Sequence, residues 1–221
     1  MKFARAISQL RVEGKAGTLF CMGVALMILL VFVGGLGLLA LFVVGKYNSL
    51  VALRNRYRNG FSQIDVQLKR RSELILNLVE VAKGHFPHER ETLEAVVSAR
   101  DFAYAAGAKA AANPGEPKTM RDLARAEAGL NRALGRLFAV GEAYPDFKAN
   151  RNRLQLSEEL TLTGTKVSFA RQAYNDAVTA YNTERELFPD NIIASMFNFA
   201  ATELFEIQNG AERAVPKASF T

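Results

Sequence analysis

The sequence predicts an all-α membrane protein: an N-terminal single transmembrane helix continuing into an antiparallel four-helix bundle with two longer outer helices. Three observations predict this fold. No charged side chain occurs between Lys15 and Lys46. After Lys46, apolar residues recur every three or four positions, the period of a helix face, and strand-like alternation is absent. Proline and glycine then punctuate this helical pattern at intervals, which predicts several helices joined by short connections.

The composition excludes several classes of protein. The 221 residues include 28 Lys and Arg against 22 Asp and Glu, and 49% are hydrophobic. This balance excludes a disordered polyelectrolyte, which combines low hydrophobicity with high net charge. One Cys and two His exclude a disulfide framework within the chain and a Cys-based zinc site. The net charge of +6 is modest and dispersed, so we expect no nucleic-acid partner.

The uncharged stretch predicts a membrane span over residues 18–45. From Leu19 to Val44 it is nearly all apolar, and about 20 such residues cross a hydrocarbon core of roughly 30 Å as a helix. A buried core helix would need a polar face, and none can be drawn here. A cleaved signal peptide would have a shorter apolar region and a small-x-small cleavage site. We therefore expect an uncleaved anchor, with the lipid bilayer as the first partner.

The charges that flank the span favour one orientation only weakly. Four cations precede the span in the short basic segment 1–17, and four follow it: Lys2, Arg5, Arg11 and Lys15, then Lys46, Arg54, Arg56 and Arg58. The N-terminal amine adds one charge, and long following domains translocate largely regardless of their own charge. This favours a cytoplasmic N-terminus with the domain on the opposite side.

The bundle domain is expected over residues 46–208, with its first two helices joined near Pro87. The first helix continues from the span and shows a stripe from Leu50 to Ala82, ending at Gly84. The second, of about 27 residues, ends at Ala112 before the loop 113–117.

Two further helices complete the predicted bundle. A third helix is expected over residues 118–142, followed by a turn at 144–146, and a fourth over 150–188. The outer two would be about 39 residues long, so they should project roughly 18–21 Å past the others as a two-helix stalk at the membrane end.

The segment after Pro189 is apolar and ends near residue 208, before an expected flexible C-terminal tail at 209–221. It either dips into the lipid headgroup region or packs on the stalk. The absence of Lys and Arg between Asp190 and Gly210 favours packing. The candidate membrane-proximal residues are Ile192, Ile193, Met196, Phe197 and Phe199.

Clustered polar residues on the first and fourth helices predict an interhelical network that fixes the helix register. We expect Arg70 or Arg71 to meet Glu159 or Asp176. The alternative is a solvated charged face. The full candidate set is Asp65, Arg70, Arg71, Glu159, Arg171 and Asp176.

The sequence predicts no catalytic, cofactor-binding or metal-binding residues, and hence no enzyme. His85 and His88 lack His-Glu-x-x-His spacing, so we expect His88 and Glu89 in the first turn of the second helix. Cys21 lies within the span, away from any base.

A row of small residues in the span, Gly17, Cys21 and Ala25, would let two helices approach closely. Such rows also arise by chance in glycine-rich spans. The row predicts a homo-oligomer.

Several segments together resemble the LemA family of bacterial membrane proteins. The resemblance covers roughly residues 46–208. It is carried by 47–51, 62–71, 73–79, 88–89, 99–100, 133–137, 142–146 and 169–178.

The resemblance implies an N-terminal membrane anchor, a helical-bundle domain and no established catalytic reaction. The expected location is the bacterial inner membrane, and the flanking charges weakly favour a periplasmic domain. Some relatives belong to magnetosome membranes, and others are discussed as neighbours of membrane zinc metalloproteases. One departure is Leu76, where family members usually have proline, which should leave the first helix straighter here. The expected function is a membrane-anchored scaffold or interaction protein that self-assembles on the bilayer. The alternative is an accessory subunit or adaptor of a membrane protease, or an envelope-stress factor.

Overall fold

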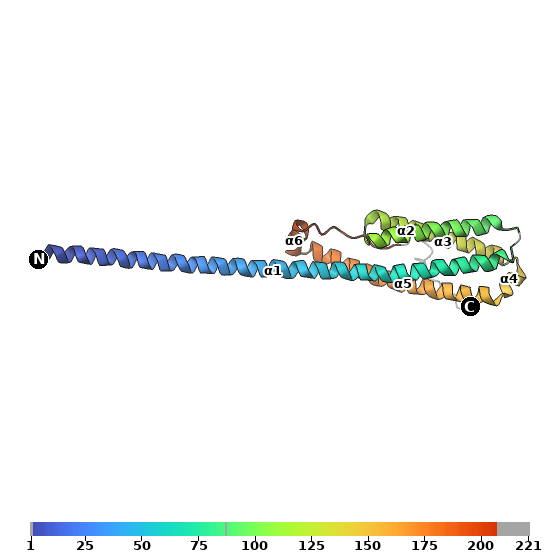
Figure 1. The fold of residues 1–221 in the computed structure, drawn as a ribbon, viewed down its shortest axis with the longest axis horizontal. Helices are drawn as coiled ribbons and strands as arrows, with labels where there is room; N and C mark the ends of the chain where they lie inside the picture. Colours follow the sequence, from blue (N-terminus) through green and yellow to red (C-terminus); the bar gives the residue numbers. More distant parts are fainter. Residues whose placement is uncertain (1, 87, 207–221) are drawn as a thin grey trace, which may run out of the picture. The chain divides into compact units, whose positions relative to one another are not determined.

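The computed structural model describes residues 2–86 and 88–206, with side chains from Leu26 onward. Over these residues it is all-helical and contains no strand (Figure 1), which confirms the all-α part of the predicted fold. The expected tail at 209–221 and the side chains of Gly17, Cys21 and Ala25 lie outside the described part. The helices are α1 (Lys2–Lys83), α2 (Arg90–Ala112), α3 (Pro117–Gly141), α4 (Pro145–Ala149), α5 (Arg151–Glu186) and α6 (Asp190–Met196).

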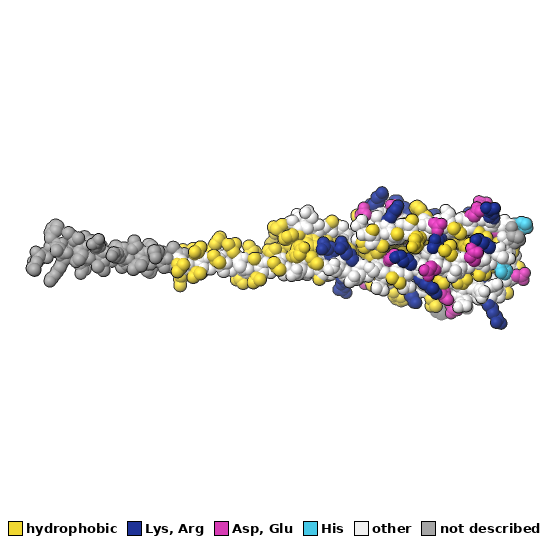
Figure 2. Space-filling model, viewed as in Figure 1, with side chains coloured by type: hydrophobic (Ala, Val, Ile, Leu, Met, Phe, Trp, Pro, Cys, Tyr) yellow, Lys and Arg dark blue, Asp and Glu magenta, His cyan; other side chains and the backbone are white. Residues whose placement is uncertain are grey.

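The chain divides into two units, Met1–Ser49 and Leu50–Thr221. In the first unit, the described side chains up to Val44 are apolar and largely exposed, and Figure 2 shows no charged side chain among them. They belong to α1, the one helix in the described chain long and apolar enough to cross a membrane. The predicted span therefore lies in a helix of suitable length and composition.

In the second unit, α1 and α5 pack closely through aromatic side chains. The Tyr57 ring centroid lies 5.2 Å from that of Tyr181, and the Phe61 centroid lies 5.8 Å from that of Tyr174. A Cβ at Gly60 would lie 3.2 Å from the Tyr174 Cα atom, so the two backbones nearly touch. These rings are almost fully buried, and they form the α1–α5 seam.

The helices α2 and α3 pack against each other as a hairpin around the loop at 113–116. Ala103 and Ala110 of α2 are buried, and a Cβ at Gly107 of α2 would lie 4.0 Å from the Leu123 side chain of α3. Small residues on one helix and leucine on the other allow a close, well-filled contact. The loop contains Gly115 at φ +89°, a left-handed conformation that favours glycine.

A short helix that the sequence did not predict closes one end of this unit. The segment expected to be only a turn forms α4, with Pro145 at its first position. Its Phe147 is fully buried, 4.6 Å from the Phe86 ring centroid. Gly141 provides the space, because a Cβ there would lie 2.9 Å from the Phe147 ring. The tertiary burial of Phe147 therefore stabilises a helix too short to form alone.

The start of the second helix was predicted incorrectly. His88 precedes the helix and Glu89 is its N-cap, so neither occupies the first helical turn, which begins at Arg90. Phe86 is buried in the aromatic cluster, and its amide donates to the Ala82 carbonyl. The chain must therefore leave this cluster before α2 can begin.

After α6 the chain forms an extended segment, residues 199–206, here called the C-terminal strap. It runs along α5 in the opposite direction (Figure 1) and buries Phe199 and Phe205. With 36 residues, α5 is indeed longer than α2 and α3. The expected two-helix stalk omitted the strap, which contacts α5 between Tyr174 and Asn182.

Substituting Gly115 should destabilise the fold, whereas substituting a helical glycine should not. In Gly115→Ala the new Cβ would collide with Thr202 Cγ2 and hold alanine at positive φ. We expect a loss of about 1–3 kcal/mol in the free energy of unfolding. Gly129 lies inside α3 with open space around it, so Gly129→Ala should instead stabilise by about 0.5–1 kcal/mol. Urea unfolding monitored by circular dichroism measures both changes, and equal effects would contradict this account.

Candidate functional site

A buried ion pair joins α1 to α3 near the middle of the second unit. Arg71 Nη1 lies 2.8 Å from Glu127 Oε2, and Arg71 also donates to the side-chain oxygen of Asn131. Glu127 is only 3% exposed. Burial raises its pKa, and the nearby Arg71 charge partly opposes that rise. Removing a charge from water is costly, so this pair stabilises register only while both partners are present.

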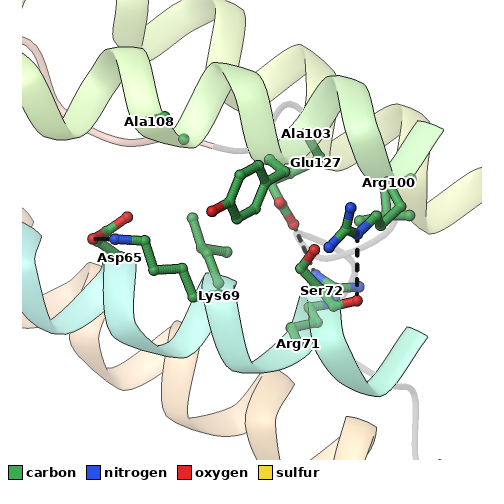
Figure 3. A pocket seen from close by; sticks show the side chains of 12 residues that line it. Asp65, Lys69, Arg71, Ser72, Arg100, Ala103, Ala108 and Glu127 are labelled. Atoms are coloured by element: carbon green, nitrogen blue, oxygen red, sulfur yellow. Dashed lines mark hydrogen bonds and ion pairs between the residues drawn. The ribbon is translucent and has the colours of Figure 1, made fainter. Parts of the chain in front are cut away.

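The space beside this ion pair is too small for a substrate. A cavity of about 20 Å³ is enclosed by side chains of α1, α2 and α3, including Lys69, Ser72 and Arg100 (Figure 3). That volume is about the space that one water molecule needs. Arg100 Nε donates to the Ser72 carbonyl at 3.4 Å, which ties α2 to α1 across the same region. These polar groups therefore serve helix packing.

The predicted polar residues do not form one network. Arg70 Nη2 lies 2.8 Å from Glu159 Oε2, so an ion pair joins α1 to α5. Asp65 pairs with Lys69 on its own helix, at 2.6 Å. Asp176 is exposed.

Arg171 is half-buried, and Arg71 turns toward Glu127 of α3. Sequence reasoning missed Glu127. Its position between Leu123 and Leu130, within an apolar stripe, was the available signal.

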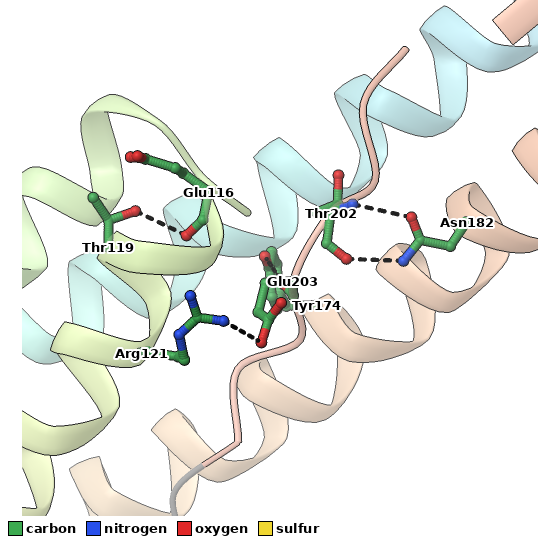
Figure 4. Close-up of polar contacts among 7 residues, drawn as sticks. All are labelled: Glu116, Thr119, Arg121, Tyr174, Asn182, Thr202 and Glu203. Carbon is green, nitrogen blue, oxygen red and sulfur yellow. Dashed lines mark hydrogen bonds and ion pairs between the residues drawn. The ribbon is translucent and has the colours of Figure 1, made fainter. Parts of the chain in front are cut away.

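The C-terminal strap is held by hydrogen bonds from α5 to its main chain. Asn182 accepts from the Thr202 amide at 3.1 Å and donates to the Thr202 carbonyl at 2.8 Å (Figure 4). Asn175 makes the same pair of bonds to Phe205, at 2.9 and 3.3 Å. An asparagine side chain here provides the same donor and acceptor as a neighbouring β-strand.

Two tyrosines reinforce this arrangement. Tyr174 donates its hydroxyl to the Glu203 carbonyl at 2.9 Å, and Tyr181 donates to the Ala200 carbonyl at 3.0 Å. Burial raises the pKa of both phenols, so they stay protonated and able to donate. The Glu203 amide in turn donates to the Gly115 carbonyl at 2.9 Å. The strap therefore links α5 to the α2–α3 loop.

The spacing of these contacts follows from helix and strand geometry. The Tyr-Asn pairs 174–175 and 181–182 are seven residues apart, about 10.5 Å along a helix. Their partners in the strap are three residues apart, about 10 Å in an extended chain. The repeated Tyr-Asn dipeptide was visible in the sequence, but nothing there indicated its extended partner.

A surface groove lies between α1 and α2, near α4. Its volume is about 740 Å³. Its floor is apolar and includes Val79, Phe86 and Leu93, all buried. The rim carries both signs of charge from Lys83, Arg90, Glu94 and Asp101.

The histidines belong to no metal-binding cluster among the described residues. His85 Nδ1 lies 2.9 Å from the Val81 carbonyl oxygen, and its ring packs at 5.8 Å from Phe147. Among the described residues no group of three or more His, Cys, Asp and Glu side chains is placed to hold a metal ion.

Comparison with known proteins places this chain among membrane-associated helical proteins. The LemA family matches residues 60–220. The chain belongs to the LemA family. Protein LemA of Metamycoplasma hominis is 26% identical over 183 residues, which cover 81% of this chain and 79% of that relative.

Magnetosome proteins are also similar to this LemA-family chain. MamQ 1 and MamQ 2 of Paramagnetospirillum magneticum are each 25% identical over 176 residues, 73% of this chain. The aligned part covers 65% of each of these relatives, slightly less than two thirds of their length. The names of these relatives state no reaction and no ligand.

Breaking the buried ion pair should cost more than removing it. Arg71→Met leaves the Glu127 carboxylate buried without its cation, and Glu127→Leu leaves the Arg71 charge, so each should lose about 3–5 kcal/mol. The double variant should lose less than the sum of the two. Urea unfolding of all four proteins measures this cycle, and strict additivity would contradict a direct interaction.

The same pair predicts a dependence of stability on pH. Burial raises the pKa of folded Glu127 above its usual 4.5, so the unfolded state ionises first as the pH rises. The contribution of Glu127 to the free energy of unfolding is fully present below its unfolded-state pKa and is lost as the pH rises through its folded-state pKa. Arg71→Met removes the charge that lowers the folded pKa of Glu127, so the loss of stability should be larger and should extend to higher pH, whereas Glu127→Gln should abolish it.

Changing either strap asparagine to aspartate should release the strap. A carboxylate cannot donate to the strap carbonyl and places a negative charge against it, so Asn175→Asp or Asn182→Asp should cost about 1–3 kcal/mol. Hydrogen exchange of the Thr202 and Phe205 amides should become faster. Asn59→Asp, at an exposed position on α1, is the matched control and should leave both amides protected. Unchanged protection in the two test variants would show that the bonds contribute little.

Proposed function

We propose that this chain is a membrane-anchored, non-catalytic helical-bundle protein that binds other proteins and self-assembles on the bilayer. Its N-terminus would lie in the cytoplasm and its domain in the periplasm. Membership of the LemA family and one candidate membrane-spanning helix support the anchored, helical part of this proposal. Two surfaces of the second unit support protein binding and self-assembly.

The groove between α1 and α2 is the observation that carries the binding function. An apolar floor with a charged rim is the usual construction of a protein interface, whose centre excludes charge and whose edge is polar. The rim charges are solvated: Arg90 and Glu94 pair with each other at 2.6 Å while both remain largely exposed. A partner segment can therefore cover the floor while the rim keeps its contact with water.

Apolar residues on the outer face of α5 support self-assembly. Leu154, Leu162 and Phe169 are exposed, and their spacing of seven and eight residues places them on one side of the helix. The opposite side of α5 is buried through Val167, Tyr174 and other residues. A helix with two apolar faces has more than one packing partner.

The buried polar groups support a non-catalytic role. Arg71 and Glu127 pair with each other. Asn175 and Asn182 bind main-chain atoms of the strap. The cavity beside the ion pair holds at most about one water molecule. These residues already have a structural task, which is to fix helix register and hold the strap.

Site-specific photo-cross-linking in native membranes tests both surfaces. With benzoylphenylalanine at Val97 in the groove or at Phe169 on α5, we expect discrete adducts, and self-assembly predicts the mass of two chains from Phe169. Thr179, exposed and polar on α5, is the control position and should give none. Adducts at neither test position would overturn the proposal. A stoichiometric adduct between Val97 and a membrane protease would favour the adaptor alternative instead.

A further inference from the structure

The segment around α6 leaves a row of large apolar side chains uncovered. Ile192 and Met196 are 54% and 66% exposed, and their four-residue spacing within α6 places them on one side of the helix. Phe188, in the turn just before α6, is 80% exposed. Leu187 and Phe197 are about half exposed beside them. These five residues are called the α6 patch.

The other side of α6 is already packed. Ile193 and Ala194 are buried, as is Asp190, the only charged residue between Leu187 and Thr202. The sequence left two alternatives for this segment, packing on the domain or contact with lipid. The structure divides the segment between a packed side and an uncovered side.

The α6 patch belongs to the end of the second unit at which Leu50 lies. Phe199, three residues after α6, has its ring 5.2 Å from the Arg54 guanidinium carbon, and Tyr181 of α5 contacts Tyr57 of α1. The five Cα–Cα steps from Gly45 to Leu50 span at most about 17 Å, whatever the relative orientation of the two units. An anchor in residues 18–45 therefore keeps this end of the domain close to the bilayer.

We propose that the α6 patch docks on the lipid bilayer, inserting its apolar side chains at the headgroup boundary. This inference rests on the membrane anchoring in the proposed function. Five side chains are too few for a stable protein interface, which buries about 800 Å² on each partner. A surface tethered beside the bilayer needs much less, because the anchor has already made the encounter intramolecular.

The charges near the patch suit a bilayer surface. The arginines Arg54, Arg58 and Arg185 lie close enough to Tyr181 to influence its pKa. Glu186 pairs with Arg185 at 2.8 Å and offsets part of this charge. No exposed carboxylate interrupts the patch itself, so no charged side chain has to enter the headgroup region with it.

Lipid quenching of a fluorophore on the full-length protein tests this docking. The Cys21→Ser protein would carry one new cysteine, labelled with nitrobenzoxadiazole, in vesicles of phosphatidylcholine and phosphatidylglycerol with or without doxyl-labelled lipid. The positions are Phe188→Cys and Ile192→Cys in the patch, with Phe102→Cys on α2 as a matched exposed control. Phe32→Cys reports whether the anchor itself lies in lipid.

Docking predicts a blue-shifted emission and several-fold stronger quenching at both patch positions than at Phe102. If the Phe32 label is quenched and the patch labels are not, docking is wrong and anchoring stands. A blue shift in the patch without quenching would mean a protein covers it, which also overturns lipid docking. An unquenched Phe32 label would refute the anchor and this inference together. Circular dichroism of each variant confirms that it remains folded.

Discussion

The close approach of α1 and α5 at Gly60 and Tyr174 is the constraint on which the second unit depends. Because the backbones nearly touch there, the rings of Tyr57 and Tyr181 pack within the seam. The Tyr174 and Tyr181 hydroxyls then emerge where the strap runs, and donate to its carbonyls. One contact between two helices therefore determines where an extended segment can lie.

The polar residues of this unit stabilise it through two kinds of interaction. Arg71 and Glu127 act between side chains, and their geometry depends on the register of α1 against α3. Asn175 and Asn182 act on a main chain and are indifferent to which side chains that chain carries. The ion pair specifies alignment at a cost in desolvation, whereas neutral amide bonds hold the strap at little electrostatic cost.

Periodicity predicted the helices because each long helix buries a continuous stripe. The bounds expected for α3 and α5 differ by only one or two residues from those observed, since proline, asparagine and glycine mark their ends. α4 could not be predicted, because five residues form a helix only when Phe147 fills a space beside Gly141. The other wall of that space is Phe86, which is distant from Phe147 in the sequence.

The candidate site was less predictable for the same reason. Arg70 of α1 does pair with Glu159 of α5, as expected, but the partner of Arg71 lies on α3, because packing turns Arg71 that way. Glu127 follows the apolar period of its helix, so its charge was the only visible anomaly. The strap has neither periodicity nor turn residues, and its order comes from bonds that α5 supplies.

The strap contacts also constrain how this part of the chain can evolve. Because α5 binds carbonyls and amides, substitutions at Ala200 or Ala201 leave every bond in place. An inserted or deleted residue is different, since it displaces the remaining strap by about 3.4 Å while the asparagines stay fixed. Natural variation at Ala200 and Ala201 should therefore change the residue type but conserve the length of the strap.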